Sequence, residues 1–221
     1  GAAPNTTYTN GIWNSLYDGI GSCNMAISLA NKAPFKTEAE RNVKVAEARF
    51  LRAIYYFNAV EQFGGVTMIT EPASSMNFAP TRTEPLTIYK EIIIPDLEFA
   101  VEWLDKGNDA TTTQPTKKAA LGMLAKVCLQ TKEYATDEYI PEALDAAKKL
   151  ITDCESGGST YGAYMYPTYE EVFAEKNNKE NKEALWKHRW YAGSDGHGSS
   201  NGNFKLNRND EKFLCNINKF G

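Results

Sequence analysis

One stretch of the sequence, residues 38–62, predicts a helix with apolar side chains on almost every side. Leu51, Tyr55 and Tyr56 point away from its main apolar stripe. A helix that is apolar over most of its circumference must be covered by neighbours on more than one side. We therefore expect a fold in which other helices flank this one. The stripe recurs at the helical spacings of three and four and comprises Val43, Ala46, Phe50, Ala53, Ile54, Phe57 and Val60.

Local signals mark both ends of this helix. Thr37 precedes it and Glu40 follows three residues later, as in a capping box. Gly64 and Gly65 come after it, and glycine accepts the left-handed backbone that ends many helices. The next residues, VTMIT at 66–70, are too few for a helix and rich in β-branched side chains, so we predict an extended segment.

The remaining pattern is mostly helical as well. Pro95 predicts a kink in the third helix. YEEVF at 169–173 predicts a short helical turn, and EALWKHRWYA at 183–192 alternates as a strand would. The other predicted helices span about residues 11–31, 86–104, 117–131 and 141–154.

The helices at 117–131 and 141–154 resemble a tetratricopeptide hairpin, with small residues where two helices cross closely. Ala143 and Ala147 are predicted at that crossing. Hairpins stacked on both sides would cover the central helix. We predict an all-α fold of tetratricopeptide-like hairpins with long irregular loops and minor strands. It forms one domain over 1–191, followed by a flexible loop and a short terminal segment over 192–221.

Composition excludes several classes of function. A formal charge of -4 gives no broad basic surface, so nucleic acid is not a predicted partner. No apolar run is long enough for a membrane span, and the opening residues GAAPNTTYTN read as a chain that begins after a removed leader. The four cysteines are scattered without metal-ligand spacing, so we predict no metal site, no disulfide and no cofactor.

Catalytic residues are not evident either. Glu170 and Glu171, with Asp195, are the carboxylates that could form a glycosidase pair. That chemistry needs two carboxyl groups facing one glycosidic bond, whereas adjacent residues on a helix diverge by about 100°. His188 and His197 lack a nucleophile or metal-binding neighbours. The chain is therefore not predicted to be an enzyme.

Two arginines in the central helix, Arg49 and Arg52, allow two interpretations. They could recognise an anion, or they could hold the scaffold together. We favour the second, in which an arginine bridges the helix to a loop and packs its stem on Tyr55 or Tyr56.

Aromatic side chains gather in a Gly-rich loop and around the predicted strand, where Trp186 and Trp190 would share the buried face. Sugar rings stack on aromatic faces, and tyrosine and tryptophan add a polar edge. Loops on a rigid scaffold are where binding groups tend to lie. Alternatively, these aromatics cap the open end of the helical stack. The candidate ligand-binding residues are Tyr161, Tyr164, Tyr166, Trp190 and Tyr191.

Five blocks of the sequence, in their order, resemble the RagB/SusD family of outer-membrane nutrient-binding lipoproteins. The resemblance covers about residues 10–190 and implies a helical scaffold that carries glycan-binding loops. It also implies an N-terminal lipid anchor in the outer membrane, absent from this chain, and a SusC-like TonB-dependent transporter as partner. The blocks are IWNSLYDGIGSCNMAI (12–27), AEARFLRAIYYFNAVEQFGGVTMITEP (46–72), YKEIIIPDLEFAVEWL (89–104), TKKAALGMLAKVCLQTKEY (116–134) and ALDAAKKLI (143–151).

Members of that family are longer, with a loop-rich C-terminal half, so this chain resembles the N-terminal half. The family's ligand residues lie in variable loops and transfer to no position here. The predicted function is a non-enzymatic carbohydrate- or nutrient-binding cell-surface lipoprotein that delivers glycans to a SusC-like transporter. The alternative is a tetratricopeptide-like, peptide-binding adaptor.

Overall fold

The computed structural model describes residues 7–72, 80–106, 114–174, 177 and 181–186. Over these residues the chain is helical, as predicted, and the β-structure is a single antiparallel bridge between Val66 and Thr83. The elements are α1 (Thr7–Lys32), α2 (Glu38–Phe63), α3 (Pro85–Ile88), a π-helical segment (Tyr89–Ile93), α4 (Ile94–Trp103), α5 (Lys117–Gln130), a 3₁₀ turn (Thr131–Tyr134), α6 (Ile140–Glu155) and α7 (Tyr169–Val172).

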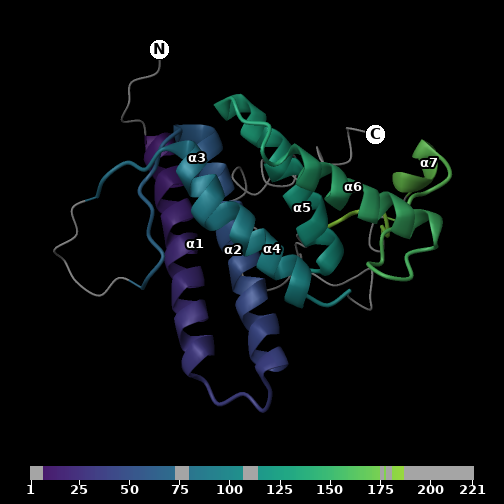
Figure 1. The fold of residues 1–221 in the computed structure, drawn as a ribbon, viewed down its shortest axis with the longest axis horizontal. Coiled ribbons are helices and arrows are strands. Elements are labelled where there is room, and N and C mark those ends of the chain that lie inside the picture. The colour runs from purple at the N-terminus through teal and green to yellow at the C-terminus, as the bar shows by residue number, and fades with distance from the viewer. Residues whose placement is uncertain (1–6, 73–79, 107–113, 175–176, 178–180, 187–221) are drawn as a thin grey trace.

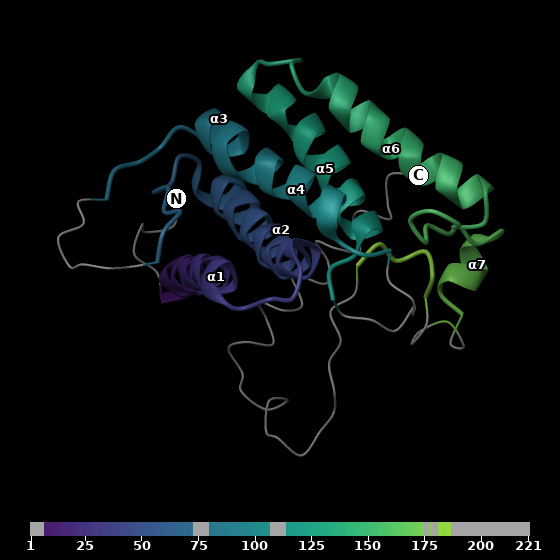
Figure 2. The same ribbon diagram turned by 60° about the horizontal axis from the view of Figure 1, so that its bottom comes forward.

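Successive long helices lie side by side and alternate in direction (Figure 1). α1 packs on α2, α2 on α4, α4 on α5, and α5 on α6. Figure 2 shows α1 and α6 at opposite ends of this array. Because α2, α4 and α5 each have a helix on two sides, their apolar residues are not confined to one narrow stripe. This arrangement explains the apolar circumference of α2 and confirms the tetratricopeptide-like class.

The ends of α2 lie where the local signals placed them. The Thr37 hydroxyl accepts a hydrogen bond from the backbone N–H of Glu40 at 3.1 Å. The Glu40 carboxylate in turn accepts the N–H of Lys36 at 3.1 Å, one residue before the position that a capping box uses. At the other end, Gly64 has φ 68° and donates its N–H to the carbonyl of Val60.

The core is centred on α2, where Phe50, Tyr56 and Phe57 have no exposed surface. Neighbouring helices close around these rings with Ile20 from α1, Leu97 from α4, and Leu121 and Val127 from α5. Cys23, Cys128 and Cys154 are free thiols, and Cys215 lies outside the described residues. Burial raises the pKa of Cys128 to about 12, which keeps this thiol protonated.

The helix predicted at 86–104 contains a π-helical segment, Tyr89–Ile93, where a simple kink was expected. The N–H of Ile94 reaches the carbonyl of Tyr89, five residues back instead of four. Pro95 follows at once, and proline has no N–H and a ring that collides with the carbonyl four residues before it. The wider turn accommodates that proline without ending the helix.

Two details of the α5–α6 region differ from the sequence predictions. In the helix crossing, Ala143 and Ala146 are buried, whereas the predicted Ala147 is only half-buried. The predicted strand at 183–192 is not formed over 183–186, and its remainder lies outside the described residues. Here Leu185 lies against Gly122 of α5 and Trp186 packs edge-on against Phe50. Packing on helices, not pairing with a strand, holds these residues.

Candidate functional site

The loop that follows α6 carries three of the predicted ligand-binding residues and is built around one carboxylate. Asp153 is 2% exposed and accepts backbone N–H groups from Thr160 at 2.7 Å, Tyr161 at 2.9 Å and Ala163 at 2.9 Å. Burial opposes ionisation of Asp153, but these three donors outweigh it, so its pKa lies below the usual value. The carboxylate therefore stays charged at neutral pH and fixes the path of the loop.

Glycine is required where this loop turns back on itself. Gly158 has φ 74°, and a Cβ at this position would lie 2.7 Å from the carbonyl oxygen of Ala163. Its N–H donates to the carbonyl of Asp153 at 2.7 Å. Lys106, three residues after the end of α4, donates its ammonium N–H to the carbonyl of Ser159 at 2.8 Å. The loop is therefore tied to its own helix and to a second part of the chain.

The three tyrosines of the loop occupy different environments. Tyr161 is half-buried and packs against the core, whereas Tyr164 and Tyr166 form an edge-to-face pair with ring centroids 5.0 Å apart. Tyr166 donates its N–H to the Glu183 carboxylate at 2.8 Å, and its hydroxyl accepts the N–H of Lys182 at 3.3 Å. The structure thus brings Tyr164 and Tyr166 together, and the hydrogen bonds to Glu183 and Lys182 fix the position of Tyr166.

A second aromatic pair, which the sequence analysis did not select, follows a few residues later in the chain. Tyr169 and Phe173 lie at either end of α7 with ring centroids 4.8 Å apart, and they are 79% and 67% exposed. Met165, between the two tyrosines, is 63% exposed. The signal was present in the sequence, because aromatic residues four apart on a helical turn share one face. These side chains give the segment 164–173 an exposed apolar surface.

Two of the predicted site residues, Trp190 and Tyr191, lie outside the described residues. Trp186 packs against the core, since its ring meets that of Phe50 at 86° with centroids 5.2 Å apart. It is half-buried, less than the buried face predicted for it, and no strand forms at 183–186.

Over the described residues, no three His, Cys, Asp or Glu side chains are placed to hold a metal ion. Glu170 is exposed on α7 and Glu171 is half-buried, while His188, His197 and Asp195 fall outside the described part of the chain. None of the helices that the structure describes combines the length and apolarity needed to cross a membrane.

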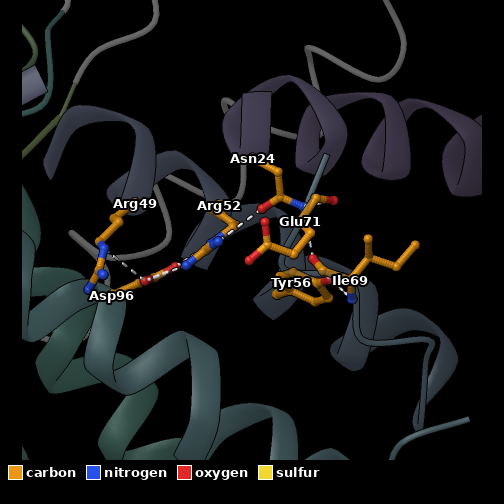
Figure 3. A network of polar contacts seen from close by, with 7 residues as sticks. All are labelled: Asn24, Arg49, Arg52, Tyr56, Ile69, Glu71 and Asp96. Carbon is orange, nitrogen blue, oxygen red and sulfur yellow. Dashed lines mark hydrogen bonds and ion pairs between the residues drawn. The ribbon is translucent and has the colours of Figure 1, made fainter. Parts of the chain in front are cut away.

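The arginines of α2 belong to the scaffold, as predicted, and Figure 3 shows both directed at Asp96 of α4. Arg52 donates to both carboxylate oxygens of Asp96, at 2.7 Å and 2.9 Å, and to the amide oxygen of Asn24 on α1 at 2.9 Å. Arg49 lies 3.7 Å from the same carboxylate, and its guanidinium stacks 4.3 Å from the Phe99 ring centroid. The expected arginine bridge from this helix to a loop runs instead, through Arg52, to α1 and α4.

The same network attaches the extended segment after α2. Asn24 donates its amide N–H to the carbonyl of Ile69 at 2.9 Å. The Tyr56 hydroxyl donates to that carbonyl at 2.8 Å and accepts the N–H of Ile69 at 2.7 Å. The Tyr17 hydroxyl donates a hydrogen bond to the carbonyl of Thr67 at 2.7 Å. The segment predicted to be extended is not helical, Val66 forms a bridge with Thr83, and side chains of α1 and α2 hold the residues that follow.

These helices, with the aromatic block that ends at Gly64–Gly65, match a known family. A SusD-like family model, described as "Starch-binding associating with outer membrane", matches residues 2–129. The chain belongs to the SusD-like family.

Individual SusD-like proteins resemble the chain over most of its length. A SusD-like protein of Bacteroides ovatus is 30% identical over an alignment of 191 residues, and the match covers 82% of this chain and 33% of that protein. A SusD superfamily protein of Parabacteroides distasonis is 26% identical, with a TM-score of 0.69 over 81% of this chain and 37% of its own. A structure described as a laminarin-binding SusD-like protein is 27% identical, with a TM-score of 0.63 over 79% of this chain and 36% of its own. The chain thus spans about a third of the length of these relatives.

Proposed function

We propose that this chain is the helical part of a carbohydrate-binding protein that serves nutrient uptake at the bacterial outer membrane. The observation that carries the proposal is the match of residues 2–129 to a family described as starch-binding and associated with the outer membrane. The laminarin-binding relative, 27% identical, supports a glycan as the ligand class. In this proposal the protein binds glycans without cleaving them.

The glycan contact is proposed on the loop after α6, at Tyr161, Tyr164 and Tyr166, and on Trp190 and Tyr191. The exposed pair Tyr169 and Phe173 extends this surface along α7 in the same proposal, a further seven residues of chain beyond Tyr166. Sugar rings stack on such exposed aromatic faces. A loop fixed by the buried Asp153 carboxylate keeps the rings in place before a ligand arrives, which lowers the ordering cost of binding.

The cellular setting is part of the same proposal. A lipid at the N-terminus of the full protein would hold it on the outer surface of the outer membrane. A SusC-like TonB-dependent transporter would receive the bound glycan. The lipid anchor and the transporter are both proposed from the family resemblance. The transporter is needed because a protein that only binds glycans must pass them to a partner that moves them inward.

The test is electrophoresis of the folded chain in native gels that contain starch, laminarin or xyloglucan. Retarded migration in at least one polysaccharide gel, relative to a gel without polysaccharide and to serum albumin, is the expected result. Unchanged migration in every gel would contradict glycan binding by this chain. Capture of peptides without any glycan retention would instead favour the tetratricopeptide-like adaptor.

A further inference from the structure

A depression of about 330 Å³ lies between the C-terminal half of α6 and the loop that follows it. Helix α6 lines it with Lys148, Lys149 and Thr152, and the loop closes it with Thr160 and Tyr161. Sites for small ligands generally occupy about 300–1,000 Å³, so the depression has room for a small group such as one sugar ring.

The acidic side chain in this depression is already fully engaged. Asp153 accepts one backbone N–H on Oδ1, from Thr160, and two on Oδ2, from Tyr161 and Ala163. These three donors stabilise the negative charge of Asp153, which the carboxylate keeps.

The remaining polar groups of the depression are cationic or carry hydroxyls. Lys149 forms an exposed ion pair with Asp145 at 2.6 Å, which is weak because water screens both groups. Lys148 makes no ion pair with any residue that the structure describes. The hydroxyls of Thr152 and Thr160 add neutral donors. Lys148 is therefore the lysine of the lining that no described carboxylate pairs, and together with the hydroxyl donors it can hold a carboxylate or sulfate group.

Tyr161 supplies the apolar element of the same site. Its ring is half-buried against the core and lines the depression, three residues before Tyr164 in the loop. We infer that the depression binds an acidic sugar residue, whose carboxylate or sulfate faces Lys148 and Lys149 while its ring lies against Tyr161. The inference rests on the proposed function and names the class of glycan, one that carries anionic groups.

The test compares an acidic oligosaccharide with its uncharged ester and with a sulfated oligosaccharide. Binding of oligogalacturonate to the folded chain is measured by calorimetry, beside its uncharged methyl ester and a sulfated galactan oligosaccharide. We expect the charged ligands to bind at least about tenfold more tightly than the methyl ester, because one hydrogen bond between charged groups is worth that much. Their affinity should fall as salt rises from 50 to 300 mM (about 14 to 6 Å Debye length), and the ester's should not. Whether carboxylate or sulfate binds more tightly identifies the source of the anion.

Variants assign the effect to this depression. Lys148→Gln should weaken the charged ligands about tenfold, and Lys148→Arg should restore most of the affinity. Lys36→Gln, an exposed lysine in the connection between α1 and α2, is the matched control and should change nothing. Equal binding of ester and acid, or an unaffected Lys148→Gln variant, overturns the inference while leaving the proposed function standing. If neither these ligands nor neutral glycans bind, both fail together.

Discussion

Arg52 on α2 and Asp96 on α4 are joined by two hydrogen bonds, Nε–Oδ2 at 2.7 Å and Nη2–Oδ1 at 2.9 Å, in the interior of the helical array. Their side chains are 9% and 3% exposed. The Nη1 group of Arg52 donates to the amide oxygen of Asn24 on α1, so one guanidinium connects α1, α2 and α4. Breaking a buried pair leaves a charge without a partner, which costs much more than the intact pair contributes.

We predict that Arg52→Met and Asp96→Leu each lower the free energy of unfolding by about 3–5 kcal/mol. The double variant should lose clearly less than the sum of the two, because it removes the Arg52 charge together with the carboxylate that pairs with it. Urea denaturation followed by circular dichroism measures all three. Lys132→Met, which breaks the exposed pair with Asp137, is the control and should cost less than about 1 kcal/mol. Additive losses in the double variant would show that the two residues do not act as a pair.

The second prediction concerns the rings at the centre of α2. Phe50→Ala and Phe57→Ala should each cost about 3–5 kcal/mol, since both rings have no exposed surface and their removal leaves cavities. Phe173→Ala, on a ring that is 67% exposed, should cost less than about 0.5 kcal/mol. Denaturant midpoints compare the three variants. Similar losses at Phe57 and Phe173 would mean that α2 is not the centre of the core.

The third prediction is that Asp153 makes the loop after α6 sensitive to acid. Its pKa is lower in the folded state than in the unfolded chain, so its stabilisation is present above the unfolded value and is lost as pH falls through the folded value. Asp153→Asn should reproduce that loss at neutral pH. Hydrogen exchange should then reveal weaker protection at the amides of Thr160, Tyr161 and Ala163.

Asp145→Asn is the matched control for this experiment, because it changes the same charge at an exposed position on α6. It should leave those three amides protected. Unchanged protection in Asp153→Asn would show that the loop holds its shape without the carboxylate.

The fourth prediction tests the proposed glycan contacts. Wild-type affinity for a retained glycan should lie between millimolar and micromolar, because shallow stacking buries little area. Tyr164→Ala, Tyr166→Ala and Tyr169→Ala should each weaken it about fivefold to tenfold without lowering thermal stability much. Affinity gels and thermal melts measure the two effects, with Phe35→Ala between α1 and α2 as the control.

Trp190→Ala belongs in the same series and tests the predicted contact that lies outside the described residues. If this variant unfolds, the tryptophan is a core residue and no ligand contact. If the full-length protein binds a glycan and its alanine variants bind it equally well, the contact lies in another part of that longer protein.

Much of the fold follows from short-range patterns in the sequence. Thr37 and Gly64 define the ends of α2 because a hydroxyl cap and a glycine with positive φ act within a few residues of the helix. The apolar circumference of α2 requires neighbours on both sides, and α1 and α4 are those neighbours. The Gly-rich composition of the loop after α6 likewise indicated a turn-rich segment, and its glycines adopt positive φ.

Tertiary structure decided the features that depend on partners distant in the sequence. Asp96 is 44 residues from Arg52, and no local pattern distinguishes it from the other carboxylates of the chain. The alternation at 183–186 predicted a strand, but Gly122 and Phe50 offer Leu185 and Trp186 apolar surfaces on helices. An apolar side chain packs where the folded protein removes most of its surface from water. For Leu185 and Trp186 that place is a surface formed by packed helices, which a local sequence pattern does not reveal.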